Sequence, residues 1–167
     1  LQSWLPLYVR SKTADDAFDV IAQSPLIGQP GEKRIYSDLG FIVLGQILRT
    51  IYGSSLEDIF EKELKPELNL KSTQFACPAR LDNVAATSVG DSYEMKMISS
   101  GTPYKVPEVI EEFSNWRSHI LSGEINDGNS FHLFNGISSH AGLFSDATDL
   151  INLSGIYLDA FGHDGVF

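Results

Sequence analysis

Tyr36 is the residue whose surroundings are best suited to acid–base chemistry, because a helix is expected to start directly after it. Ser37 is a residue type that often caps helices, Asp38 suits the positive first turn, and Gly53 suits the C-terminal end. The phenol of Tyr36 would lie near the positive end of this helix, which favours the anionic form that a general base needs. Local chemistry alone favours the other interpretation, a half-buried aromatic side chain that packs on the helix start.

No serine in the sequence has the neighbours of a catalytic nucleophile. None is followed by a lysine three positions later, and the Gly-x-Ser-x-Gly pattern of a nucleophile elbow does not occur. The sequence therefore offers a candidate base at Tyr36 but no serine for it to activate.

The glycine- and asparagine-rich loop around residue 126 carries two acids, Glu124 and Asp127, which could form a catalytic carboxylate pair. We expect both to be solvated instead, as acids in such loops usually are. The stretch Asn126–Asn129 lacks the ligand spacing and bidentate glutamate of a calcium loop, so we predict a turn. We predict neither a metal site nor a cofactor, because no metal-binding spacing is found among the histidines, which are His119, His132, His140 and His163.

The composition is that of an acidic globular protein. The 167 residues are 43% hydrophobic and carry a net charge of −10, from 22 acidic and 12 basic residues. Such a charge should repel nucleic acids and anionic membranes, so no nucleic-acid partner is expected. No run of residues approaches the roughly 18 apolar positions of a membrane-spanning segment. Cys77 is the single cysteine, which fits neither a disulfide framework nor a zinc site and predicts a small core or loop residue.

Helical periodicity predominates, so we predict one mainly α domain over residues 1–167 with minor β structure. Helices are predicted at 13–24, at 37–53, from 54 or 55 to 66, from 145 to just before Gly162, and as a short segment within 107–116, with short strands at 84–87 and 95–98. The helix that follows Tyr36 is apolar on most faces, which predicts that it is buried. The residues at both chain ends suggest a piece of a longer protein.

Several stretches together resemble the serine hydrolases related to class C β-lactamases, penicillin-binding proteins and their esterase cousins. Tyr36–Gly45 resembles the Tyr-x-Asn segment and following helix of that family, and Lys65–Thr73 resembles its EPLGM-x-x-T turn. Gly123–Asn129 and His140–Leu150 together resemble its GEVHD…GHAGLFSTA-x-DL stretch, and Leu1–Pro6 resembles the segment after its HTSGL motif. The order and spacing of these stretches match the family over most of the chain outside its middle part.

Such enzymes use three motifs: Ser-x-x-Lys, Tyr-x-Asn, and Lys-Thr-Gly or His-x-Gly. This sequence contains only the second. The resemblance implies that the serine lies before Leu1 and the third motif after Phe167, so that the partner of this chain is the remainder of its parent. His140 has the His-x-Gly spacing, but its context resembles a stretch that precedes the third motif. The sequence leaves the compartment open, although the resemblance suggests a bacterial protein that could be exported to the periplasm.

By this resemblance Tyr36 is the general base of an acyl-serine hydrolase, and Asp38, where the family often has asparagine, contacts a small-molecule substrate. An ionised carboxylate only accepts hydrogen bonds and repels a substrate carboxylate, so Asp38 favours esters, amides or amine-bearing groups over penicillin-like substrates. The isolated chain should be inactive because it lacks the nucleophile. The alternative is a non-catalytic binding or structural module that keeps the fold and uses the 123–145 loop to hold a ligand or partner.

Overall fold

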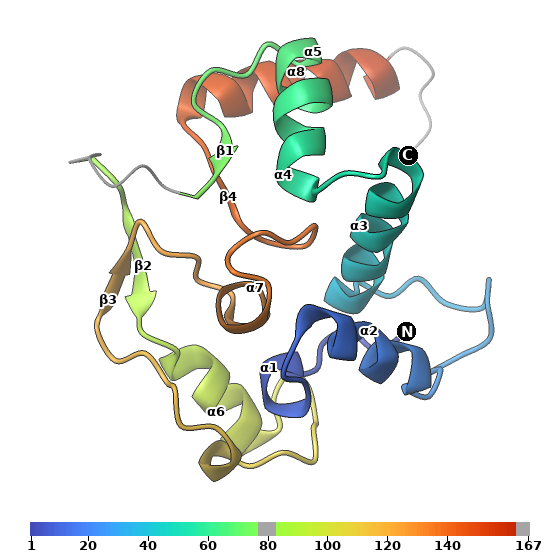
Figure 1. Ribbon diagram of the computed structural model, residues 1–167, viewed down its shortest axis with the longest axis vertical. Helices are drawn as coiled ribbons and strands as arrows, with labels where there is room; N and C mark the ends of the chain where they lie inside the picture. The colour runs from blue at the N-terminus through green and yellow to red at the C-terminus, as the bar shows by residue number, and fades with distance from the viewer. Residues whose placement is uncertain (77–82, 163–167) are drawn as a thin grey trace.

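The computed structural model describes residues 1–76 and 83–162, and this part of the chain is largely helical with few and short strands (Figure 1). Cys77 and His163 lie outside the described residues. The helices are α1 (Leu7–Arg10), α2 (Ala14–Gln23), α3 (Asp38–Tyr52), α4 (Leu56–Ile59), the π-helical η1 (Phe60–Leu64), α5 (Lys65–Glu67), α6 (Ser92–Ser100), the 3₁₀ turn η2 (Ile110–Glu112), α7 (Gly128–Leu133) and α8 (Ala147–Gly162).

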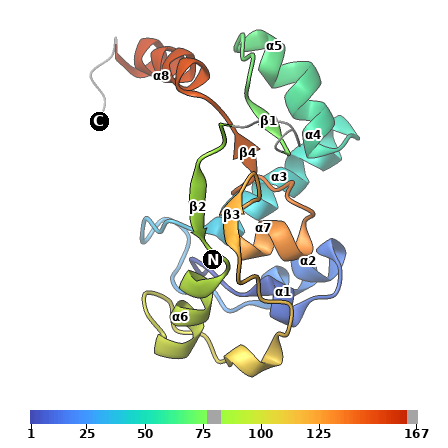
Figure 2. The same cartoon turned by 90° about the vertical axis from the view of Figure 1, so that its left-hand side faces the viewer.

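The strands form two antiparallel pairs, which Figure 2 shows one above the other between α8 and α6. One pair joins β1 (Gln74–Phe75) to β4 (Leu143–Phe144). The other joins β2 (Ala86–Val89) to β3 (Ile120–Ser122), so β2 overlaps the strand predicted at 84–87. Both pairs connect segments that are far apart in the sequence.

Local capping sets the starts of the longer helices. The Thr13 hydroxyl accepts a hydrogen bond from the Asp16 N–H at 3.1 Å, and the Asp16 carboxylate accepts one from the Thr13 N–H at 2.9 Å, which forms a capping box on α2. Ser37 Oγ accepts a hydrogen bond from the Gly40 N–H at 3.0 Å where α3 starts. At the other end of α3, Gly53 adopts the left-handed conformation with φ 60°. This predicted helix is therefore confirmed at both ends.

Two predictions for shorter segments are wrong. Residues 95–98 are not a strand but part of helix α6, which buries Met97 and Ile98 on one side. Four residues are too few to separate a period of about 2 from one of about 3.6, and tertiary packing selects the helical period here. The turn expected at 126–129 instead leads into helix α7, whose N-cap is Asp127 and whose first residue is Gly128. The short helical segment predicted within 107–116 is present as the three-residue 3₁₀ turn η2.

Two helix ends also differ from the prediction. Pro66 does not close the helix that begins after Ser55 but lies within α5, at a position where its missing N–H is tolerated. Gly162 is the last residue of α8 rather than a residue beyond its end.

Helix α3 is less buried than its apolar sequence predicts. Only Leu39, Ile42 and Gly45 are buried, and the exposed apolar residues are Phe41, Leu44, Ile47, Leu48, Ile51 and Tyr52. The prediction of burial on most faces is wrong for this chain, because its other elements cover one side of α3. Among the described residues no single helix is long and apolar enough to cross a membrane, although α3 and Leu56–Glu67, bent by 74°, would together meet that criterion by length and composition.

The main hydrophobic core joins α1, α2, α7 and the first turns of α3. Its buried members are Leu5, Leu7, Tyr8, Ala17, Ile21, Leu39, Ile42 and Leu133. Asn129 is fully buried at the centre of this contact. It accepts a hydrogen bond from the Leu7 N–H at 2.8 Å and donates one to the Leu5 carbonyl at 2.9 Å. The N-terminal segment is therefore held against α7, which lies near the middle of the molecule in Figure 1.

A carboxylate attaches α8 to the turn before β1. Asp149 accepts hydrogen bonds from the N–H groups of Lys71, Ser72 and Thr73 at 2.7–3.0 Å, and from the Thr73 hydroxyl at 2.8 Å. These bonds, the one from Lys71 most of all, lower the pKa of Asp149 to about 2. Two stretches that are separate in the sequence therefore meet here, next to the β1–β4 pair.

Gly45 lies where the loop of residues 136–142 crosses α3, and a Cβ at this glycine would lie 2.6 Å from the Cβ of Ser139. We expect Gly45→Ala to lower the free energy of unfolding by about 1 kcal/mol or more, because overpacking outweighs the gain in helix propensity. Gly40→Ala is the matched control, since its Cβ would meet Ser37 at an ordinary 3.5 Å. Urea denaturation measures the difference, and equal stabilities of the two variants would contradict this packing.

Candidate functional site

A cleft of about 1020 Å³ is lined by the start of α3, by β2 and α6, and by the loops that precede α7 and α8. Six carboxylates line it: Asp38, Asp91, Glu94, Glu124, Asp127 and Asp146. Within the described residues no lysine, arginine or histidine lines the cleft. Its aromatic wall includes Trp4 and Tyr104, whose rings stack with centroids 6.2 Å apart. The cleft is therefore acidic, with an aromatic side.

Tyr36 and Asp38 form a pair at the start of α3. Tyr36 is 69% exposed, and its ring makes a tilted contact with Phe41 at a centroid distance of 6.2 Å. The negative charge of the neighbouring Asp38 is the largest of the influences that raise the pKa of Tyr36. This direction is opposite to the one expected from the helix dipole. In the chain by itself the raised pKa keeps the Tyr36 phenol protonated and makes it a poor base.

The N-terminal segment positions this pair through two backbone contacts. Ser37 Oγ donates a hydrogen bond to the Gln2 carbonyl at 2.6 Å, and the Asp38 N–H donates one to the Ser3 carbonyl at 2.9 Å. The half-buried carboxyl of Asp38 then faces the cleft, where burial raises its pKa. The start of α3 is consequently held on both sides of its N-cap.

Asp127 and His140 form a second pair beside the first. His140 Nε2 lies 2.9 Å from Asp127 Oδ1, and His140 Nδ1 lies 2.7 Å from Ser138 Oγ. The same carboxylate accepts a hydrogen bond from the Ser130 N–H at 2.7 Å and so caps α7. Burial alone would raise the pKa of Asp127, but the hydrogen bond and charge of His140 outweigh it and lower that pKa.

The chain Ser138–His140–Asp127 has the order of a serine-hydrolase triad, but its serine cannot act as a nucleophile where it lies. Ser138 is 6% exposed and does not line the cleft, so a substrate carbonyl has no access to its oxygen. The arrangement instead fixes both nitrogens of the His140 ring. We therefore assign it the role of orienting that imidazole.

Glu94 projects from α6 into the contact between α1 and α7. Its carboxyl accepts hydrogen bonds from the Tyr8 hydroxyl at 2.6 Å and from the Gly128 N–H at 2.5 Å. Gly128 permits this approach, because a Cβ at that position would collide with the Glu94 carboxyl. Burial, with a further contribution from the charge of Asp127, raises the pKa of Glu94 to about 7.

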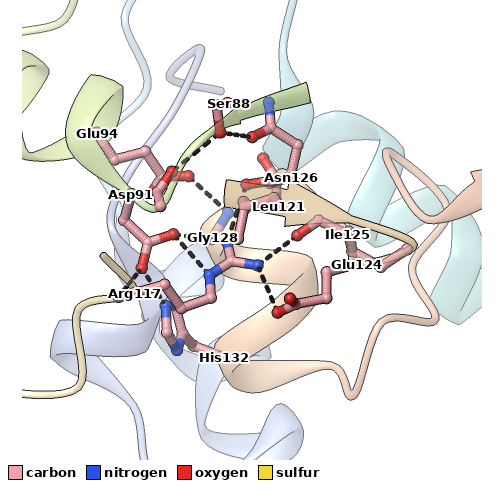
Figure 3. A network of polar contacts seen from close by, with 12 residues as sticks. Ser88, Asp91, Glu94, Arg117, Leu121, Glu124, Ile125, Asn126, Gly128 and His132 are labelled. Atoms are coloured by element: carbon pink, nitrogen blue, oxygen red, sulfur yellow. Dashed lines mark hydrogen bonds and ion pairs between the residues drawn. The ribbon is translucent and has the colours of Figure 1, made fainter. Parts of the chain in front are cut away.

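Arg117 and Asp91 form a buried ion pair behind the cleft (Figure 3). Arg117 donates to Asp91 Oδ1 through Nε at 2.9 Å and Nη2 at 2.5 Å, and to the carbonyls of Ile125 and Asn126 at 2.6 and 3.1 Å. His132 Nε2 lies 3.0 Å from Asp91 Oδ2. Burial alone would raise the pKa of Asp91, but the hydrogen bonds from Arg117 outweigh it and lower that pKa.

The structure separates the two acids that the sequence placed in one solvated loop. Glu124 lies 2.6 Å from His119 Nε2, whereas Asp127 pairs with His140 and its side chain is 22% exposed. Solvation is therefore the wrong prediction for Asp127. Sequence reasoning also missed Glu94, whose partner Tyr8 lies 86 positions away, so no local pattern connects them.

The comparisons with known proteins agree with this architecture. A family model described as Beta-lactamase matches residues 2–164. The chain is 30% identical over 161 residues to an N-acetylmuramyl-L-alanine amidase of Bacillus subtilis (strain 168). The aligned region covers 89% of this chain and 32% of that protein. It is also 30% identical over 159 residues to a "Putative D-alanyl-D-alanine carboxypeptidase" of Salmonella newport (strain SL254). That aligned region covers 93% of this chain and 34% of that protein.

The fold is similar to that of solved structures. One of them is the octameric penicillin-binding protein homologue from Pyrococcus abyssi, with a TM-score of 0.51 and 18% identity over 95% of this chain and 28% of that chain. The chain spans about a third of the length of the curated relatives that it matches.

Glu94 should make stability depend on pH near neutrality. Its pKa is higher in the folded chain than the ordinary 4.5, so the folded state binds the extra proton and loses stability as the pH rises toward 7. Relative to Glu94→Gln, we expect the wild-type free energy of unfolding to fall by on the order of 3 kcal/mol between about pH 4.5 and pH 8. Urea denaturation at a series of pH values measures this fall. Asp19→Asn, an exposed acid on α2, is the control, and parallel profiles for wild type and Glu94→Gln would refute the role of Glu94.

Proposed function

The chain belongs to the Beta-lactamase family, and we propose that it is the helical part of a serine hydrolase that acts through an acyl-serine intermediate. The observation that carries this proposal is the Tyr36–Asp38 pair, held at the capped start of α3 with its carboxyl on an acidic cleft. Relatives named as an amidase and as a carboxypeptidase support hydrolase chemistry of a general kind.

The parent chain would supply what this part lacks. The chain spans about a third of its curated relatives, and α3 exposes a row of apolar residues that other described elements leave uncovered. An exposed apolar face of this kind usually marks a contact surface. We infer that the remainder of the parent packs on α3 and brings the nucleophilic serine to the N-terminal end of that helix.

The catalytic step then follows from the state of Tyr36. Its pKa is raised by the neighbouring Asp38, so the phenol keeps its own proton unless a positive charge compensates that carboxylate. In the family that the chain resembles, the lysine of Ser-x-x-Lys would supply such a charge, and the Tyr36 phenol would then release its proton to solvent. The phenolate would take the proton of the serine hydroxyl as the serine oxygen bonds to the substrate carbonyl carbon, while donors elsewhere stabilise the oxyanion.

The charge of the cleft restricts the small-molecule substrate. A substrate carboxylate close to Asp38 would be repelled, and no lysine or arginine among the described lining residues offsets that repulsion. Esters, amides and amine-bearing groups therefore fit this part of the site better than penicillin-like acids do.

The alternative is a binding or structural module without catalysis. It is favoured by one observation, the raised pKa of Tyr36, which makes the phenol a poor base in the chain as it stands. In that case the cleft itself, with its 124–127 and 141–146 walls, would hold the ligand. The absence of a Ser-x-x-Lys motif upstream in the parent would select this alternative.

In the complete parent, we expect Tyr36→Phe to lower kcat/KM by about 100-fold or more, because general-base catalysis typically contributes that much. Turnover of p-nitrophenyl butyrate and of a chromogenic cephalosporin measures it. Tyr157→Phe, on α8 and outside the cleft lining, is the control for a changed tyrosine side chain. The chain by itself should turn over these substrates no faster than its own Tyr36→Phe variant. Clearly faster turnover would contradict the claim that the nucleophile lies elsewhere.

In the same parent, Asp38→Asn should raise kcat/KM for the cephalosporin by about tenfold. The substitution removes the repulsion between the Asp38 carboxylate and the substrate carboxylate, whose free energy corresponds to a factor of about that size. Turnover of the neutral ester should not rise in parallel. If cephalosporin turnover stays unchanged or falls, the specificity assigned to Asp38 is wrong.

A further inference from the structure

The first turn of α7 carries two polar side chains with no exposure to solvent, Asn129 and Ser130. Buried polar groups are nearly always hydrogen-bonded, so their partners show which segments they hold. Asn129 bonds to the N-terminal segment at Leu5 and Leu7. Ser130 Oγ donates a hydrogen bond to the Ala141 carbonyl at 3.0 Å. One turn of α7 therefore holds two segments that are far apart in the sequence.

The N-terminal segment continues from α7 to the start of α3. The Gln2 carbonyl accepts a hydrogen bond from Ser37 Oγ at 2.6 Å. The Ser3 carbonyl accepts one from the Asp38 N–H at 2.9 Å. These two contacts lie on either side of the peptide bond that follows Ser37, the N-cap of α3. The backbone next to Tyr36 is therefore held by this segment.

The loop of residues 136–142 meets α3 at a different point. Ser139 Oγ donates a hydrogen bond to the Phe41 carbonyl at 2.5 Å. Phe41 lies inside the helix, whereas Tyr36 precedes its N-cap. The loop therefore fixes the body of α3, and the N-terminal segment fixes the backbone that carries the phenol.

The N-terminal segment is too short and too well packed to absorb a displacement between its contacts. The Asn129 amide accepts from the Leu7 N–H at 2.8 Å and donates to the Leu5 carbonyl at 2.9 Å. Only Trp4 separates Leu5 from Ser3, and it is 4% exposed and packed against α6. Protein interiors packed in this way transmit strain. A shift at Asn129 should therefore reach the start of α3.

We propose that Asn129 is a positioning residue for Tyr36. Its amide fixes the N-terminal segment, and that segment fixes the backbone at the start of α3 from which the phenol projects. Asn129 does not line the cleft, so it acts through other residues rather than on a substrate. The effect on catalysis rests on the proposed function, whereas the link from Asn129 to the start of α3 does not.

Asn129→Asp breaks this link with little change in shape. The carboxylate still accepts the hydrogen bond of the Leu7 N–H, but it cannot donate to the Leu5 carbonyl and repels that oxygen instead. Asp149→Asn is the matched control, because it exchanges the same two residue types at another buried anchor, which is 1% exposed. That anchor holds the turn before β1 rather than the N-terminal segment.

The Asp38 N–H reports the link directly. It belongs to the first residue of α3 and has no acceptor within that helix, so the Ser3 carbonyl protects it from hydrogen exchange. In Asn129→Asp we expect its exchange, followed by NMR, to become faster by about tenfold or more relative to the buried Ile59 N–H of α4. This is the effect of losing roughly one hydrogen bond. No selective change at Asp38, or an equal change in Asp149→Asn, would overturn the proposal.

A measurement on the unmodified chain guards against a variant that does not fold. At a series of low urea concentrations, the N–H groups of Leu7 and Asp38 should exchange through one common opening, because one segment holds both. The opening free energy and its dependence on urea should then be the same for the two groups. Separate openings would overturn the proposal without any substitution.

The complete parent then separates this inference from the proposed function. If Asn129 acts through Tyr36, Asn129→Asp should lower kcat for p-nitrophenyl butyrate by about tenfold or more, with a smaller change in KM. It should cost nothing further in a Tyr36→Phe background, because the group that it positions is then absent. The effect of Asp149→Asn should instead add to that of Tyr36→Phe.

Two results would reject the positioning role in a parent that depends on Tyr36. One is additivity between Asn129→Asp and Tyr36→Phe, and the other is an equal departure from additivity for Asp149→Asn. A parent whose activity does not depend on Tyr36 would reject the proposed function and leave the exchange result standing.

Discussion

The buried ion pair between Asp91 and Arg117 is the contact on which the geometry of the cleft depends. One guanidinium engages Asp91, holds the carbonyls of Ile125 and Asn126, and stacks 3.8 Å from the ring centroid of Phe131 on α7. The start of α6, the loop before α7 and α7 itself are therefore joined through a single side chain (Figure 3). Removing one partner of such a pair leaves an uncompensated buried charge, which is far more costly than losing a surface contact.

Four of the six acids of the cleft lie in four different environments, and the differences define the site. Asp91 is paired with a permanent cation, Asp127 is paired with a histidine, and burial raises the pKa of Glu94 to about 7. Asp38 lacks an arginine or lysine partner among the described residues, and its charge raises the pKa of Tyr36. The least compensated carboxylate thus lies beside the candidate base, where an incoming cation would have the largest effect on both groups.

The exposed face of α3 and the raised pKa of Tyr36 support one interpretation. The first is unfavourable in a self-contained protein because it leaves apolar surface in water, and the second keeps the candidate base protonated. Both would be relieved by a partner that covers α3 and places a positive charge near its N-terminus. Relatives about three times as long have room for such a partner within one chain.

Interactions between residues close in the sequence allowed part of this structure to be predicted. Capping by Thr13 and Ser37 and the left-handed Gly53 act within a few residues, so the ends of α3 and the start of α2 could be predicted. Segments such as α6 and α7 are too short for periodicity to identify, and their packing decides their form. The properties of the site could not be predicted from local patterns. The raised pKa of Glu94, the pairing of Asp127 with His140 and the exposure of α3 all depend on groups that only folding brings together. Residue types identified Tyr36 and Asp38 as candidates, and the effect of Asp38 on the pKa of Tyr36 is local, since only one residue separates them. Tertiary structure decided the pKa of Asp38, because burial and the charges of distant residues act through distance in space rather than through separation along the chain.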